Sequence, residues 1–288
     1  MLRNPINKET GVRVKEIIEI PEFELSNGVK IPALGMGTFP IGNKRIPMVM
    51  REAKKIGYTL FDTSSSYGNE LGVGLSLGRH DFITTKISNY DQKNDSVRLG
   101  FRKSRLKLHR KQIDLLLLHW PYPGRFAESW KVLEELYERG ACRAIGVANF
   151  KIHHLEELME TAEIAPMVNQ FERHPMHADN ELVEYCRAHD IAPEAYTPFA
   201  RMDERLFGDS RLSDIARHHG KKATQIILRW NYQNGIISIP KTESPVRMLE
   251  NATIFDFELS DDEMSVIDSM DRGMRVRHDS DNCDFDKL

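Results

Sequence analysis

The sequence predicts an α/β protein of the (β/α)8 TIM-barrel class, with an N-terminal β-hairpin cap and extra helices near the C-terminus. Eight short apolar runs alternate along the chain with segments of helical periodicity, a pattern typical of parallel strands joined by helices. The 288 residues suit one such barrel, which commonly takes about 250 residues. Polar titratable residues also follow several of the runs, as expected at the C-terminal mouth of a barrel.

The predicted strands are apolar runs that end in polar or small residues. They cover residues 33–38, 58–63, 82–86, 113–119, 144–149, 167–170, 191–196 and 236–241. The helices between them show apolar stripes: Trp130, Leu133 and Tyr137 recur at three- and four-residue spacing, and Gly140 follows as a stop. This spacing predicts a helix that packs one face on the barrel.

The two ends of the chain add to the basic repeat. Asn27-Gly28 between two strand-like runs predicts a hairpin that closes the N-terminal end of the barrel. Residues 211–220 and 223–235 carry two helical patterns where the repeat needs one, and Ser260 with Glu263 forms a capping box for a late helix.

No linker marks a second domain, so we expect residues 1–288 to form one barrel domain. In it, residues 1–20 are an N-terminal extension, and residues 271–288 are an irregular tail that folds over the mouth.

Composition excludes several classes of protein. The net charge of -3 predicts no strong attraction to nucleic acid or to anionic membranes. No run is long and apolar enough for a membrane span, and the N-terminal residues lack the apolar core of a signal peptide, so we expect a cytoplasmic protein. Cys142, Cys186 and Cys283 are too scattered for a disulfide framework or a zinc site, which predicts three reduced thiols.

The most informative residues are Asp62, Tyr67, Lys86 and His119, which lie at or just after the ends of three successive strands. Reduction of a carbonyl places negative charge on its oxygen, and a proton or hydrogen bond must be delivered there. Tyr67 can donate the proton, because a neighbouring Lys86 ammonium would lower its pKa from about 10. Asp62 would orient Lys86, and His119 would hydrogen-bond the carbonyl oxygen.

Each of these four residues also has an ordinary structural explanation. Asp62 could cap a helix, Tyr67 could be a half-buried aromatic residue, Lys86 a solvated strand end, and His119 a satisfied core histidine. Packing alone does not explain why three neighbouring strands all end in titratable groups. Their joint position therefore favours a catalytic site.

Here the sequence resembles the aldo-keto reductase family, of the bacterial 2,5-diketogluconate reductase or aldehyde reductase type. The resemblance runs through FDTSSSYGNE, ITTK, DLLLLHWP, GVANF, NQFERHP, AYTPF and IPKTESPVRMLEN. It implies a barrel that binds a nicotinamide dinucleotide without a Rossmann fold, usually NADPH (NADP⁺ when oxidised) and less commonly NADH. It also implies that Tyr67 is the proton donor, tuned by Asp62 and Lys86, and that His119 orients the substrate.

The same resemblance implies the cofactor-binding residues. They are Gly37, Thr38, Asp62, Asn149, Gln170, Tyr196, Thr197, Phe199, Lys241, Thr242, Arg247, Glu250 and Asn251. The amides of Asn149 and Gln170 suit a nicotinamide carboxamide, on whose ring Tyr196 could stack. Lys241 and Arg247 suit a phosphate monoester, although they could also be solvated surface charges.

The predicted substrate pocket consists of Phe39, Tyr67, Ser88, His119 and Trp120. Ala148 stands where the family usually has a serine, so one hydroxyl contact to the nicotinamide carboxamide is lost and cofactor binding should be weaker. Ser88 stands where many members have a tryptophan, so one pocket wall should be wider. The connection after His119 is short, which favours small polar carbonyl compounds. The loop that follows Tyr196 is unusually charged at residues 201–205, so whether it clasps the cofactor stays open.

Several other patterns are weaker. The glycines of residues 71–78 miss the G-x-G-x-x-G spacing by one residue and suit helix packing better. His174 and His177 lack a metal-binding helix motif, and no metal is expected. The adjacent pairs His153-His154 and His218-His219 should diverge toward solvent. No Tyr-x-x-x-Lys is present, which argues against a short-chain dehydrogenase.

The sequence thus predicts an NADPH-dependent oxidoreductase that reduces small, polar or sugar-derived aldehydes and ketones, as a monomer or weak dimer. Two alternatives stay open. One is a cofactor-binding barrel with a regulatory or redox-sensing role and little turnover. The other is a metal-dependent hydrolase on the same barrel, which would require a stoichiometric metal ion.

Overall fold

The computed structural model describes residues 17–288, and its centre is a parallel sheet of eight strands in chain order. A parallel bridge between Leu34 and Ser238 joins the first strand segment to the last, so the sheet closes into a barrel. The strands are β3 (Met36–Gly37), β4 (Leu60–Asp62), β5 (Phe82–Ile87), β6 (Ile113–Leu118), β7 (Cys142–Ala148), β8 (Val168–Glu172), β9 (Ala192–Tyr196) and β10 (Ile237–Ser238). Each of the eight predicted runs overlaps one of them.

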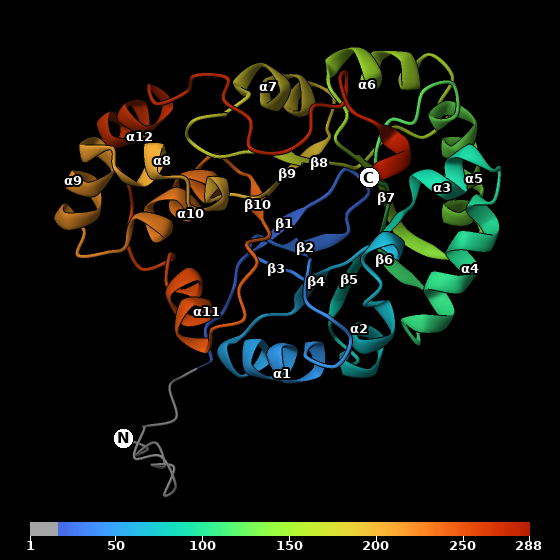
Figure 1. Cartoon of the computed structure of the whole chain (residues 1–288), viewed down its shortest axis with the longest axis horizontal. Helices are drawn as coiled ribbons and strands as arrows, with labels where there is room; N and C mark the ends of the chain where they lie inside the picture. The colour runs from blue at the N-terminus through green and yellow to red at the C-terminus, as the bar shows by residue number, and fades with distance from the viewer. Residues whose placement is uncertain (1–16) are drawn as a thin grey trace, which may run out of the picture.

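Helices connect successive strands and surround the barrel (Figure 1). The α-helices are α1 (Ile46–Ile56), α2 (Glu70–Ser76), α3 (Asn89–Lys93), α4 (Val97–Lys107), α5 (Phe126–Glu138), α6 (Ile152–Met159), α7 (Asn180–Ala188), α8 (Glu204–Phe207), α9 (Ser210–His218), α10 (Ala223–Gln233), α11 (Pro245–Ala252) and α12 (Asp261–Asp268). Three 3₁₀ turns are η1 (Ser65–Tyr67), η2 (Ala200–Met202) and η3 (Phe285–Lys287). None of the helices within residues 17–288 has the length and apolarity required to cross a bilayer.

The core follows from the apolar runs. The side chains of β6 from Leu115 to Leu118 are fully buried, because a parallel strand in a barrel is covered on both faces. Trp130 and Leu133 of α5 are also fully buried, which confirms the predicted contact face of that helix.

The predicted hairpin is present at the N-terminal end of the barrel. Strands β1 (Glu22–Glu24) and β2 (Lys30–Pro32) pair antiparallel, and the Asn27 side chain donates to the carbonyl of Arg143 at the start of β7. Gly28 has a φ of +81°, a left-handed conformation that suits glycine in a short hairpin loop. Most of the predicted extension, residues 1–20, lies outside the described residues.

Both additional helical patterns form, as α9 and α10, and α12 begins with the predicted capping box. The Ser260 side chain accepts from the Glu263 backbone N–H, and the Glu263 side chain accepts from the Ser260 N–H. Helix α2 carries Gly72 and Gly74, two of the three glycines that resembled a nucleotide loop. A Cβ on Gly74 would lie 2.2 Å from the Lys107 carbonyl oxygen, so close packing on α4 explains this glycine.

The tail after α12, residues 271–288, crosses the opposite end of the barrel, and we call it the C-terminal strap. Figure 1 shows it in red, running from α12 past α7 and α6. It contacts residues at or just after the ends of three strands: Glu172 at the end of β8, Lys151 after β7 and Asn89 after β5. Within the strap the backbone is irregular up to the short turn η3.

Candidate active site

The barrel mouth brings the four predicted catalytic residues together. Asp62 is the last residue of β4, Lys86 lies near the end of β5, and His119 follows β6. Tyr67 ends the short turn η1 directly after β4. Parallel strands place their C-terminal ends at one face of the barrel, so these side chains meet although up to 57 residues separate them along the chain.

Asp62 and Lys86 form a buried ion pair. The Lys86 ammonium lies 2.7 and 2.6 Å from the two Asp62 carboxylate oxygens and also donates to the Thr63 carbonyl at 3.0 Å. The exposed fractions are 1% for Lys86 and 3% for Asp62. Burial acts to lower the pKa of Lys86, but the Asp62 carboxylate outweighs it and the net pKa is raised. Lys86 therefore carries its charge.

Tyr67 lies above this pair. The Ser64 hydroxyl caps η1 by accepting from the Ser66 N–H, and Gly68 ends the turn at a φ of +68°. The Lys86 nitrogen is 5.2 Å from the centre of the Tyr67 ring. Burial raises the pKa of Tyr67, and Lys86 acts in the opposite direction without overcoming it. The prediction of a net lowered pKa for Tyr67 is therefore wrong, and the phenol stays protonated at neutral pH.

His119 is a neutral imidazole beside Tyr67. Burial lowers its pKa well below 6.5, and the positive charges of Lys86 and Arg277 add to this effect. Its Nδ1 lies 3.3 Å from the Ser64 hydroxyl oxygen. That oxygen already accepts from Ser66, so its own hydrogen is available for Nδ1. The arrangement leaves Nε2–H as a donor.

Behind the ion pair lies a carboxyl group that the sequence reasoning did not single out. Glu194 on β9 is fully buried, and neither of its oxygens has a hydrogen-bond partner among the described residues. Burial and the negative charge of Asp62 raise its pKa to about 8. Gln170, its register neighbour on β8, donates to Asp62 at 2.9 Å. A charged residue inside the strand-like run 191–196 was the available signal.

The residues predicted to hold a nicotinamide also reach the mouth, and they contact one another. The Tyr196 hydroxyl donates to the Asn149 side-chain oxygen at 2.6 Å, and the Asn149 amide donates to the His119 carbonyl. Gln170 is bonded to Asp62. Each amide retains further donor and acceptor capacity, so both can still accept a ligand.

Backbone close to the mouth is shaped by Gly37 and by the loop after β9. A Cβ on Gly37 would lie 2.9 Å from the Ile239 carbonyl oxygen, and Thr38 donates its hydroxyl to the Asp62 carbonyl. Thr197 has a φ of +52°, which is unusual for this residue type, and Phe199 is half-buried. In the charged part of this loop, Arg205 and Asp203 pair with each other at 2.6 Å.

The predicted phosphate-binding cluster flanks the start of α11. Lys241 and Arg247 are exposed, whereas Thr242 and Asn251 are buried. The Lys241 ammonium lies 3.0 Å from a carboxylate oxygen of Glu243, so one negative charge already sits inside the cluster. Glu250 lines a cavity of about 350 Å³ between α10 and α11.

The aromatic residues of the predicted substrate pocket lie next to one another, whereas Ser88 has a different role. Phe39, 47% exposed, packs on Tyr67 at a centroid distance of 4.9 Å, and the Trp120 ring lies beside His119. Ser88 instead serves as the N-cap of α3, where its hydroxyl accepts from the Asp91 N–H.

Two expectations about histidines are wrong. His218 and His219 do not diverge, because both rings reach the Glu263 carboxylate, each at 2.9 Å. His153 and His154 likewise lie 3.2 and 3.7 Å from Asp281. Each pair converges because a carboxylate from a distant segment lies between the rings, a contact that helical geometry alone does not reveal.

Known proteins are similar to this chain over most of its length. The aldo/keto reductase family model matches residues 33–272. The glyoxal reductase of Bacillus subtilis is 42% identical over 270 residues, covering 91% of this chain and 97% of the relative. The methylglyoxal reductase DkgA of Escherichia coli K12 is 36% identical over 267 residues, covering 90% and 96%.

A solved structure of a Gox0644 variant in complex with NADPH superimposes with a TM-score of 0.88 at 36% identity, covering 92% of this chain and 99% of the other. Family model, relatives and fold thus lead to the same assignment. The chain belongs to the aldo/keto reductase family.

Proposed function

We propose that this protein is an NADPH-dependent reductase of small polar aldehydes and ketones, including 2-oxo aldehydes. The observation that carries the proposal is the buried Asp62–Lys86 pair beneath Tyr67, with a neutral His119 beside it. The similar proteins named as glyoxal and methylglyoxal reductases support the substrate class.

The residues present fit NADPH. Two exposed cations, Lys241 and Arg247, stand at the start of α11. There a phosphate monoester can be bound by the lysine ammonium, a compact charge, and by the paired N–H donors of the arginine guanidinium. At the mouth, Asn149 retains a free N–H and lone pair for a carboxamide. When bound, the nicotinamide supplies the hydride that the protein's own residues cannot supply.

Tyr67 delivers the proton to the oxygen of the reduced carbonyl. Because burial raises the pKa of Tyr67, its hydroxyl stays protonated throughout the neutral range. As the proton leaves, the Lys86 ammonium beside the ring stabilises the phenolate that forms, and Asp62 keeps Lys86 charged and in place. The charge is thus stabilised when it appears, rather than in the ground state.

His119 holds the carbonyl oxygen. A neutral imidazole with Nε2–H can donate a hydrogen bond to that oxygen without introducing a competing acidic proton. Its ring lies edge-on to Tyr67 at a centroid distance of 5.7 Å, so one oxygen atom can contact both donors. This arrangement orients the carbonyl so that its carbon can receive the hydride and its oxygen the proton.

We also propose that the protein acts in the cytoplasm as a monomer or weak dimer. Cys142, Cys186 and Cys283 are free thiols in the structure, as expected for a reducing compartment. Size-exclusion chromatography with light scattering tests the oligomeric state.

The proposed function is tested by the absorbance loss of NADPH with a panel of glyoxal, methylglyoxal and a neutral aliphatic ketone. Turnover with the aldehydes supports the proposal. Tight NADPH binding with no reduction of any carbonyl would overturn it and favour the regulatory alternative. Turnover that depends on added metal and water but not on NADPH would favour a hydrolase.

A further inference from the structure

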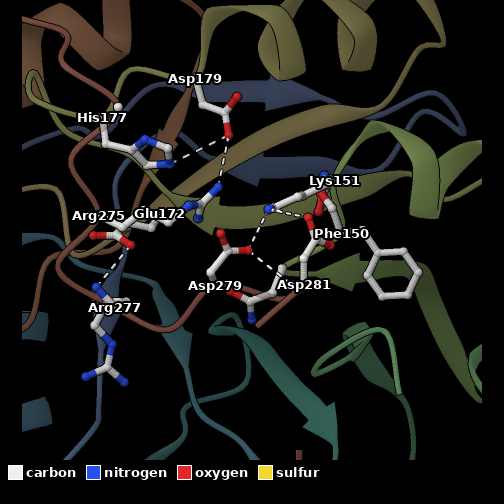
Figure 2. Close-up of polar contacts among 12 residues, drawn as sticks. Phe150, Lys151, Glu172, His177, Asp179, Arg275, Arg277, Asp279 and Asp281 are labelled. Carbon is white, nitrogen blue, oxygen red and sulfur yellow. Dashed lines mark hydrogen bonds and ion pairs between the residues drawn. The ribbon is translucent and has the colours of Figure 1, made fainter. Parts of the chain in front are cut away.

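The C-terminal strap is fixed across the mouth on one side by Glu172. This fully buried carboxylate accepts the backbone N–H groups of Val276 at 2.7 Å and of Arg277 at 3.2 Å. Just beyond, Lys151 pairs with Asp279 at 2.5 Å and with Asp281 at 2.6 Å. The backbone at Arg277 is therefore held at the ends of β7 and β8 (Figure 2).

The far end of the strap is fixed on the other side of the mouth. The Asn89 side chain donates to the Phe285 carbonyl at 2.9 Å. The Phe285 ring packs edge-on to Trp120 at 6.4 Å and to Tyr122 at 5.7 Å. Arg277 thus lies on a segment that is anchored on both sides of the mouth, so the backbone from which its side chain extends is held in place.

The guanidinium of Arg277 has no partner in the part of the chain that the structure describes. Arg275, two residues earlier, pairs with Asp179 at 3.5 Å. No carboxylate of residues 17–288 lies within ion-pair distance of Arg277. Figure 2 shows its side chain pointing away from the ion pairs of the strap.

The positive charge of Arg277 affects the pKa values of groups that line the mouth. It acts to lower the pKa of Tyr67, of His119 and of Tyr196, which come from three different parts of the barrel rim. The anchors of the strap lie on both sides of these groups: Glu172 is the register neighbour of Tyr196, and Trp120, on which Phe285 packs, lies beside His119. Arg277 therefore lies on the segment that crosses between them.

A half-buried cation has lost part of its hydration, and an anion is the partner that restores this loss. We propose that Arg277 is a specificity-determining residue that pairs with a carboxylate on the substrate, so that the enzyme favours aldehydes or ketones that carry one. This inference rests on the proposed reductase function and narrows its substrate class. Arg277 acts in binding and takes no part in proton transfer.

The test compares two substrates that differ by one charge: succinic semialdehyde and its methyl ester. In the wild type, kcat/KM should be higher for the acid. Arg277→Gln should lower kcat/KM for the acid on the order of tenfold to a hundredfold and change the ester far less. Arg277→Lys should recover part of the loss. Arg272→Gln, an exposed arginine on the same strap, is the matched control and should leave both substrates unchanged.

Binding measurements separate this inference from the proposed function. Succinate carries the carboxylates but no reducible carbonyl, and its calorimetric titration in the presence of NADP⁺ should show binding that Arg277→Gln weakens. If the wild type reduces neither substrate but succinate binding depends on Arg277, the function fails and the inference stands. Equal losses for acid and ester, weaker NADPH binding in Arg277→Gln, or succinate binding unaffected by the substitution would each overturn the inference.

Discussion

Glu194 should make the stability of this protein fall as the pH rises, and Glu194→Gln should remove that dependence. The carboxyl group is fully buried, its oxygens have no hydrogen-bond partner among the described residues, and Asp62 adds negative charge nearby. The folded protein therefore keeps Glu194 protonated at neutral pH. Glutamine is the close uncharged equivalent of this state.

The magnitude follows from the two pKa values of Glu194. Folding raises its pKa from 4.5 to about 8, so the stability contributed by the protonated group is complete below pH 4.5 and is lost as the pH rises to 8. Each pH unit in this window costs about 1.4 kcal/mol. The loss is about 3 kcal/mol by pH 7 and about 5 kcal/mol above pH 8.

Urea unfolding of wild type and Glu194→Gln between pH 5 and 9 measures this effect. The difference between the two free energies of unfolding should widen up to pH 8 and then level off. Glu172→Gln gives a contrast on the neighbouring strand. Burial acts to raise the pKa of Glu172, but His174 and the Val276 N–H outweigh it and the net pKa is lowered. Removing this carboxylate should therefore lower the free energy of unfolding at neutral pH. A Glu194→Gln difference that does not vary with pH would refute the reasoning.

Two further predictions concern catalysis and the cofactor. The kcat/KM for reduction should be flat between about pH 6 and 8, because the pKa of His119 lies well below 6.5 and that of Tyr67 is raised; a break near pH 6.5 in the pH profile would show that His119 titrates normally. Glu243→Gln should tighten NADPH binding about two- to fivefold by freeing Lys241, while NADH binding stays constant. Fluorescence titration with both cofactors checks this, and equal changes for the two would place Glu243 away from the phosphate.

The fold was predictable because its pattern is local. Each strand is an apolar run, and each run ends at the same face of a parallel barrel, so the meeting of Asp62, Lys86 and His119 follows from topology alone. The capping box of Ser260 and Glu263 is equally local. These features need no knowledge of which distant segments touch.

The remaining features depend on distant contacts. The net pKa of Tyr67 depends on how deeply the phenol is buried, which the motif does not encode. His218 and His219 converge because Glu263 arrives from another helix. The strap has no periodicity, so its anchoring by Glu172 could not be read from its own residues.

The central claim is that Tyr67 donates the proton above the Asp62–Lys86 pair, and Tyr67→Phe tests it most directly. Phenylalanine keeps the ring contact with Phe39 and removes only the hydroxyl. Steady-state reduction of methylglyoxal should lose a factor of about 10² to 10⁴ in kcat, the usual contribution of a general acid. NADPH binding, measured by fluorescence titration, should be unchanged. Wild-type kcat in this variant with intact NADPH binding would contradict the account.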